Sequence, residues 1–132
     1  MIDPDESISI ATGQIQDYLV VTLQNDLTDT QLLALRSTVL ERLQRYGLAG
    51  VVLDLSGVSV LDLTEFDALR ELGDMTRLLG ASTVMVGLNP GIVSFLIGMD
   101  AATDDIIVAR GLEDGLERLR RERAKRAGRD AS

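Results

Sequence analysis

The sequence predicts an α/β domain with a mixed, mostly parallel sheet of about five strands and four helices. Two observations lead to this prediction. Short β-rich runs alternate with helix-patterned segments along most of the 132-residue chain, as is typical of parallel strands joined by right-handed helical crossovers. The first two β-rich runs follow each other without a helix between them, which indicates an N-terminal hairpin.

The first third of the chain predicts the hairpin and one helix. We expect strands over residues 7–11 and 18–23, joined by a turn at residues 12–14 that contains a glycine. Thr28 is a suitable N-cap for the next helix, with Gln31 at the capping-box position. Leucine and valine then recur at helical spacing until Gly47, where we expect the helix to end.

The middle of the chain predicts a buried strand, a second helix and another strand. Residues 48–55 are almost entirely apolar, which indicates a central strand covered on both faces. Asp62 is a suitable cap for the second helix, and Glu65 completes a capping box. The apolar side of this helix is expected to comprise Phe66, Leu69, Leu72, Leu78 and Leu79. Residues 83–86 predict the next strand.

The last third predicts two helices separated by a short strand. Asn89 and Pro90 favour a helix start, and the run to about Gly98 is apolar enough that we expect a mostly buried helix. A short strand is predicted over residues 105–108. The last helix is expected to begin near Gly111 and to place Leu112, Leu116 and Leu119 on one stripe. We expect one domain over residues 1–127 and a disordered tail over residues 128–132.

The composition argues against an enzyme. The chain contains no cysteine and no histidine, which removes catalytic triads, thiol nucleophiles and nearly all zinc sites. We therefore expect no catalytic residue, no bound metal and no cofactor. The acidic start does not have the pattern of a signal peptide, and no apolar run approaches the ~20 residues that span a bilayer. These features favour a cytoplasmic protein that does not act at a membrane.

The charge distribution argues against nucleic-acid binding. Residues 1–116 carry 18 acidic residues and six arginines, whereas residues 117–132 carry seven basic residues and three acidic ones. A strongly negative body repels a phosphate backbone. The basic end has no aromatic residue, and we interpret it as the solvated face of the last helix.

The sequence resembles the STAS domain of bacterial anti-anti-sigma factors, and within this family it is most similar to the RsbS-type scaffold of the stressosome. The resemblance extends over roughly residues 8–121. It depends on the strand and loop at residues 50–58, the turn at residues 86–93 and the closing segment at residues 111–117, together with residues 8–10, 18–24, 73–74 and 78–81.

The resemblance implies a binding protein. Proteins of this type assemble with paralogous sensor proteins that carry the same domain, as homo- or hetero-oligomers. They sequester a serine kinase of the histidine-kinase-like ATPase superfamily until phosphorylation releases it. In an α/β sheet of this kind, partners engage the carboxyl ends of the strands. We therefore expect the loops at residues 56–63 and 87–91 to form the kinase-binding edge, with these binding residues: Asp62, Leu63, Thr64, Glu65, Asp67, Asn89 and Pro90.

One position departs from the family pattern. The usual phosphoacceptor serine directly follows the acid equivalent to Asp62, and here that position is Leu63, which has no hydroxyl group. Thr64 is the alternative phosphoacceptor, because a phosphate on a first helical turn meets the helix dipole. The carboxylates of Asp62, Glu65 and Asp67 oppose such a phosphate. Thr64 is equally explained as an ordinary first-turn residue.

The acidic first turn also permits two interpretations. Its carboxylates could mimic a permanently phosphorylated state, or they could simply be the acids that any helix start favours. Three functions therefore remain open from the sequence. They are a stressosome-like scaffold, a phosphorylation-controlled antagonist of an anti-sigma kinase, and a module that binds a small anion or nucleotide at a helix N-terminus.

Overall fold

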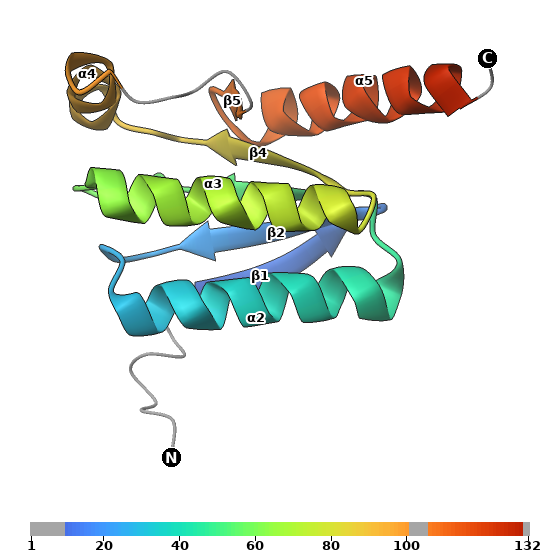
Figure 1. Cartoon of the computed structure of the whole chain (residues 1–132), viewed down its shortest axis with the longest axis horizontal. Coiled ribbons are helices and arrows are strands. Elements are labelled where there is room, and N and C mark those ends of the chain that lie inside the picture. The colour runs from blue at the N-terminus through green and yellow to red at the C-terminus, as the bar shows by residue number, and fades with distance from the viewer. Residues whose placement is uncertain (1–9, 101–105, 131–132) are drawn as a thin grey trace.

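Helices cover both faces of a five-stranded sheet (Figure 1). The computed structural model describes residues 10–100 and 106–130. The elements in chain order are β1 (Ile10–Ile15), β2 (Tyr18–Leu23), α2 (Asp29–Tyr46), β3 (Gly50–Asp54), α3 (Leu63–Leu78), β4 (Ser82–Val86), α4 (Pro90–Gly98), β5 (Ile107–Ala109) and α5 (Leu112–Asp130). The predicted fold class, with its five strands and four helices, is confirmed.

The sheet is mixed and follows the order of the sequence. β1 pairs antiparallel with β2, and the remaining neighbours pair in parallel in the order β2, β3, β4, β5. Successive side chains of β3 alternate between two cores: Val51 and Leu53 lie in the core with α2 and α3, whereas Val52 lies in the core with α5. This double burial explains why the β3 sequence is continuously apolar.

Both predicted capping boxes form. The Thr28 hydroxyl accepts from the Gln31 backbone N–H, and the Gln31 side chain accepts from the Thr28 backbone N–H, both at 3.2 Å. Asp62 and Glu65 make the same reciprocal pair at the start of α3. Gly47 ends α2 in a left-handed conformation with φ 61°, as the sequence predicted.

The predicted hairpin turn at residues 12–14 is wrong. These residues belong to β1 and pair with residues 19–21 of β2. The turn is formed instead by Gln16 and Asp17, and Gln16 has a positive φ of 54°. The turn was predicted at residues 12–14 because they contain Gly13, but a glycine is also tolerated in an exposed edge strand. Residues 7–9 of the predicted first strand lie outside the described residues.

Two helices bury less apolar surface than the sequence predicted. α4 was expected to be mostly buried, but only Ile92 and Leu96 are buried. α3 buries Phe66, Leu69, Leu72 and Thr76, whereas Leu78 is 87% exposed. In both cases the helix lies against the rest of the protein along one stripe only, so apolar residues outside the stripe meet solvent.

α5 covers the second face of the sheet. Leu116 and Leu119 are buried there, whereas Leu112 is 37% exposed. A Cβ atom at Gly115 would lie 2.8 Å from Val86 Cγ1, so glycine permits the close approach of α5 to β4. The helix continues through residue 130, although the sequence predicted a disordered tail from residue 128. No helix in the described part of the chain is long and apolar enough to cross a membrane.

Candidate functional site

Two loops meet at the carboxyl edge of the sheet, as the sequence predicted. One connects β3 to α3, and the other connects β4 to α4. The Asn89 side-chain amide donates to the carbonyl oxygens of Val58 (3.3 Å) and Ser59 (3.1 Å), while its Oδ1 accepts from the Ile92 backbone N–H at 2.9 Å. One side chain therefore caps α4 and joins it to the loop before α3.

Asp26 brings a third segment to the same edge. Its Oδ1 accepts from the backbone N–H groups of Ser59 at 2.7 Å and Val60 at 3.2 Å. The sequence analysis did not identify Asp26 as a site residue. The available signal was its position just after β2, because β2 is parallel to β3 and ends at the same edge of the sheet.

Gly57 allows the β3–α3 loop to lie directly against the chain that follows β2. A Cβ atom at this position would lie 2.5 Å from the Leu23 carbonyl oxygen and 2.9 Å from Gln24 Cα. Both are backbone atoms and cannot rotate away. The loop conformation that leads to Asp62 therefore requires glycine here.

The first backbone N–H groups of α3 are capped by side chains of the same helix start. The Asp62 carboxylate accepts from the Glu65 backbone N–H at 2.7 Å, and the Glu65 carboxylate accepts from the Asp62 backbone N–H at 3.1 Å. Thr64 is exposed on this first turn. Leu63, one of the predicted binding residues, is half-buried and packs against the core. Most of the Leu63 side chain therefore packs inside the protein, and only part of it is accessible to a partner.

The same turn concentrates negative charge. Burial raises the pKa of Glu65 above its ordinary value, and the nearby carboxylates of Asp62 and Asp26 raise it further, although the hydrogen bond from the Asp62 backbone lowers it. Asp67 is exposed and forms an ion pair with Arg70 at 3.1 Å. Arg70 therefore offsets part of the acidic charge one turn into the helix.

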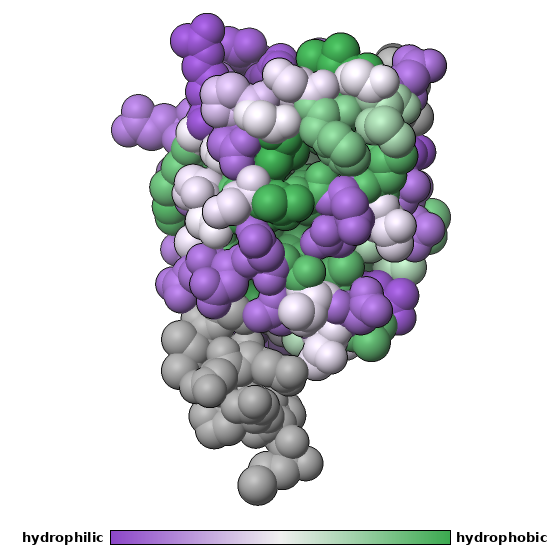
Figure 2. Space-filling view, turned by 90° about the vertical axis from the view of Figure 1, so that its left-hand side faces the viewer, coloured by the Kyte–Doolittle hydropathy of each residue, from purple (hydrophilic) through white to green (hydrophobic). Residues whose placement is uncertain are grey.

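A set of exposed, uncharged apolar side chains flanks the buried stripe of α4 on both sides and includes one residue of the β3–α3 loop. It comprises side chains of α4, the residue that follows α4 and the β3–α3 loop, with exposed fractions between 38% and 75%: Val60, Val93, Phe95, Ile97 and Met99. We call it the α4 surface. Figure 2 views the molecule from this edge, and apolar side chains gather in its upper half, at the height of α4 in Figure 1. Pro90, at the first position of α4, is also exposed.

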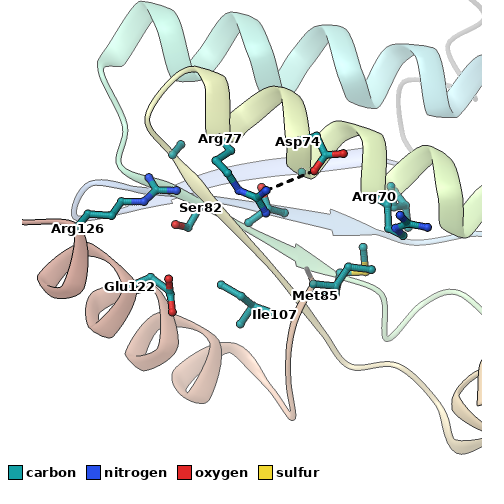
Figure 3. A pocket seen from close by; sticks show the side chains of 13 residues that line it. Arg70, Asp74, Arg77, Ser82, Met85, Ile107, Glu122 and Arg126 are labelled. Carbon is teal, nitrogen blue, oxygen red and sulfur yellow. Dashed lines mark ion pairs between the residues drawn. The ribbon is translucent and has the colours of Figure 1, made fainter. Parts of the chain in front are cut away.

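The pocket of Figure 3 lies elsewhere, between α3, β4 and α5. Its volume is about 230 Å³. The charged groups around it already interact within the chain: Arg77 pairs with Asp74 at 3.6 Å, and Arg126 donates to the Gly80 carbonyl oxygen at 2.7 Å. The described residues also contain no group of three or more acidic side chains that could hold a metal ion.

Comparison with protein families identifies the fold. The family model of the STAS domain matches residues 9–100, which include the whole carboxyl-edge site. The chain belongs to the STAS domain family. Among curated proteins, no match to this STAS chain is found.

Solved structures show the same fold at low sequence identity. A point variant of RsbS from Moorella thermoacetica is 24% identical, with a TM-score of 0.72 over 87% of this STAS chain and 97% of that chain. A chain from the molecular architecture of the stressosome, a signal integration and transduction hub, is 23% identical, with a TM-score of 0.67 over 84% and 96%. The anti-sigma factor antagonist SpoIIAA in its unphosphorylated form is 11% identical, with a TM-score of 0.67 over 84% and 96%. These likenesses concern the fold.

Proposed function

We propose that this STAS domain is a non-enzymatic regulatory scaffold of a stressosome-like complex. It binds a serine/threonine switch kinase of the histidine-kinase-like ATPase type at its carboxyl edge, and paralogous STAS sensor proteins at other surfaces. The observation that carries the proposal is the exposed α4 surface, on a helix whose cap, Asn89, is bonded to the loop that leads to the acidic start of α3.

The composition of this edge suits a protein partner. Protein interfaces combine an apolar centre, from which charged residues are depleted, with a polar rim. The α4 surface provides the apolar centre, with Ile97 75% exposed and Phe95 41% exposed. Asp62 and Asp67 provide exposed acidic groups at the rim. An apolar area of this kind costs solubility unless a partner covers it.

The similar structures support a regulatory binding role. One of them is named RsbS, another comes from a stressosome, and a third is an anti-sigma factor antagonist. We infer the kinase partner from the family resemblance given in the sequence analysis, and the shared fold and the exposed edge support it.

The test is a binding measurement with the serine kinase of this type encoded nearest to the gene. Ile97→Glu places a charge on the α4 surface near the end of its helix. Leu78→Glu is the matched control, because Leu78 is 87% exposed at the end of α3. We expect Ile97→Glu to weaken kinase binding by at least about tenfold, which corresponds to about 1.4 kcal/mol, and Leu78→Glu to leave it unchanged. Equal effects of the two variants would contradict the placement of the site.

A second pair of variants tests the acidic turn. Asp62→Asn removes the charge but keeps a side chain that caps helices well, whereas Asp62→Lys reverses the charge. If the kinase recognises the acidic rim, binding falls in the order wild type, Asp62→Asn, Asp62→Lys, and the differences shrink at high salt. Unchanged binding in both variants would remove the acidic turn from the interface.

The alternative function is a phosphorylation-controlled antagonist of an anti-sigma kinase. The exposed position of Thr64 on the first turn of α3 supports it, since a kinase could reach the hydroxyl there. Mass spectrometry after incubation with kinase and ATP distinguishes the two functions. Phosphate on Thr64 that is lost in Thr64→Ala supports the antagonist, whereas kinase binding without phosphate transfer supports the scaffold.

A further inference from the structure

β1 forms one edge of the sheet in the part of the chain that the structure describes. Among the described residues it pairs with β2 only. Most of its side chains are exposed, and no helix covers it closely. An edge strand presents unpaired backbone N–H and C=O groups to solvent, and this makes it a template for another strand.

The two edges of the sheet differ in their protection. β5 has three residues, and the Arg118 guanidinium donates to the Val108 carbonyl oxygen at 3.3 Å. β1 has six residues with the sequence IATGQI, which contains no charged residue and no proline. Charges, prolines and short length are the usual means by which proteins block edge pairing. β5 uses two of them, and β1 uses none.

The register of the hairpin shows which backbone groups of β1 face outward. Gln16 and Asp17 form a two-residue loop, so Ile15 and Tyr18 are the hydrogen-bonded closing pair. Bonded pairs alternate along an antiparallel ladder. The backbone groups of Ala11 and Gly13 therefore point to β2, and those of Ile10, Thr12 and Gln14 point away from the sheet.

We propose that β1 pairs with β1 of a second copy of this chain, antiparallel and about a two-fold axis at Thr12. A two-fold axis perpendicular to the sheet keeps α2 and α3 of both copies on the same face, and it requires one residue to lie opposite itself. Centring on Thr12 places Ile10 opposite Gln14 of the second copy. Each outward group of these three residues then has a partner, and the two sheets become continuous.

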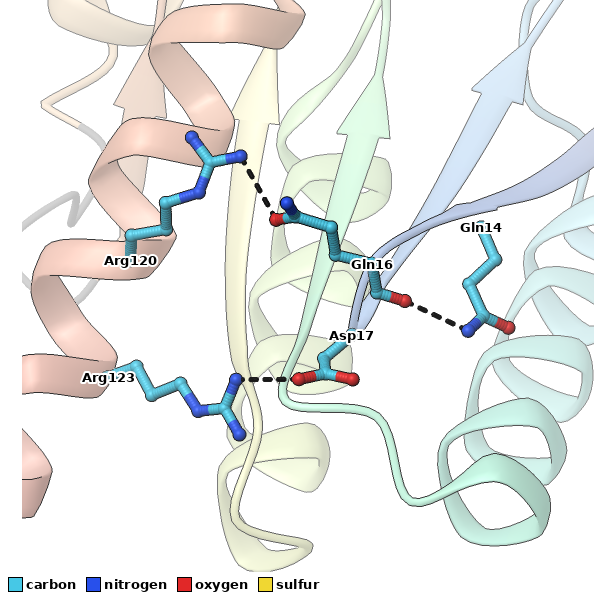
Figure 4. Close-up of polar contacts among 5 residues, drawn as sticks. All are labelled: Gln14, Gln16, Asp17, Arg120 and Arg123. Carbon is cyan, nitrogen blue, oxygen red and sulfur yellow. Dashed lines mark hydrogen bonds and ion pairs between the residues drawn. The ribbon is translucent and has the colours of Figure 1, made fainter.

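The charges around β1 favour a second copy as the occupant. At the end of the hairpin, Arg120 donates to the Gln16 side chain at 3.2 Å, and Arg123 pairs with Asp17 at 2.8 Å (Figure 4). The chain before β1 carries Asp3, Asp5 and Glu6. Antiparallel pairing brings Ile10 of one copy, which this acidic segment precedes in the sequence, opposite Gln14 near the arginine-flanked turn of the other. No charged side chain of β1 itself opposes the approach.

The expected dimer is weak. Pairing of five residues in each strand is smaller than a standard interface of about 1,600 Å². The whole chain is therefore measured by sedimentation equilibrium at total concentrations from about 10 to 500 µM, where micromolar association is visible. We expect a reversible monomer–dimer equilibrium. A wild-type chain that remains monomeric throughout, or that pairs only with a sensor paralogue, overturns the proposal.

Substitution of Thr12 identifies the contact. Thr12→Pro removes an outward N–H group, which an edge strand tolerates, and we expect it to abolish dimers. Thr12→Lys places two lysines about 5 Å apart across the axis, and Thr12→Glu does the same with two acids. Each variant alone is expected to be monomeric, whereas a mixture of the lysine and glutamate variants forms a heterodimer.

The mixture decides the geometry, because only a two-fold axis at residue 12 places that residue opposite itself. Circular dichroism checks that each variant is folded. If Thr12→Pro is unfolded, the Thr12→Lys and Thr12→Glu variants still test the proposal. Dimers of Thr12→Lys as strong as those of wild type, or a mixture that stays monomeric, overturn the proposal. The inference is independent of the kinase-binding proposal, and Thr12→Lys is expected to bind the kinase as wild type does.

Discussion

Asn89 donates a hydrogen bond to the carbonyl oxygen of Ser59 at 3.1 Å, across 30 residues of chain. The same side chain accepts from the backbone N–H of Ile92 at the start of α4. The side chain that caps α4 therefore also fixes the loop that leads to α3. One polar side chain thus connects the start of α4 to the loop that leads to the acidic start of α3.

Because Asn89 has these two roles, we expect two substitutions at this position to have different effects. Asn89→Ser keeps a side chain that caps helices but cannot donate an amide hydrogen bond to Val58 or Ser59, whereas Asn89→Ala loses both functions. We expect Asn89→Ala to lower the free energy of unfolding by about 1–2 kcal/mol and Asn89→Ser by less. Both should weaken kinase binding, because both release the loop. Urea denaturation and the kinase assay measure the two effects separately.

Gly57 provides a steric prediction. Gly57→Ala places a Cβ atom 2.5 Å from the Leu23 carbonyl oxygen, so the loop or β2 must shift, at an expected cost of about 1–3 kcal/mol. Gly73→Ala is the control, because its nearest neighbour would be Thr83 Cβ at 4.0 Å and the position lies inside α3. Alanine there should stabilise the helix by about 0.5–1 kcal/mol. Thermal unfolding of the two variants should move in opposite directions.

The order of the elements was predictable from the sequence largely because three of the four helices carry their own start signal. Thr28, Asp62 and Asn89 cap the helices that the sequence assigned to them. Local hydrogen bonding is sufficient for such signals. The hairpin turn was not predictable in the same way, because Gln16 adopts its positive φ without glycine and is held by Arg120 from a distant part of the chain.

The candidate site was predictable only in part, and the reason is burial. The residue types around Asp62 and Asn89 indicated the edge, and the topology of a parallel sheet brings their loops together. Which apolar residues of α4 face solvent depends on how the helix lies on the sheet, so the sequence predicted a mostly buried helix although Ile97 is 75% exposed. Asp26 was missed because its two partners, Ser59 and Val60, lie more than 30 residues away.

Glu65 makes the stability of the domain depend on pH in a defined direction. Burial and nearby carboxylates raise its pKa in the folded state above the ordinary value. Between the ordinary pKa and the raised one, the folded state binds more protons than the unfolded state, so the free energy of unfolding falls as pH rises through that window.

Glu65→Gln removes this titration while leaving an amide oxygen that can accept from the Asp62 backbone, as Gln31 does at the start of α2. The stability of the variant relative to wild type should therefore increase from acidic to neutral pH, by less than about 1 kcal/mol because the group is partly exposed. Urea denaturation at about pH 3.5 and pH 7, on either side of the carboxyl range, measures the difference. A relative stability that stays constant or decreases with pH would show that the surroundings of Glu65 do not disfavour its charged form.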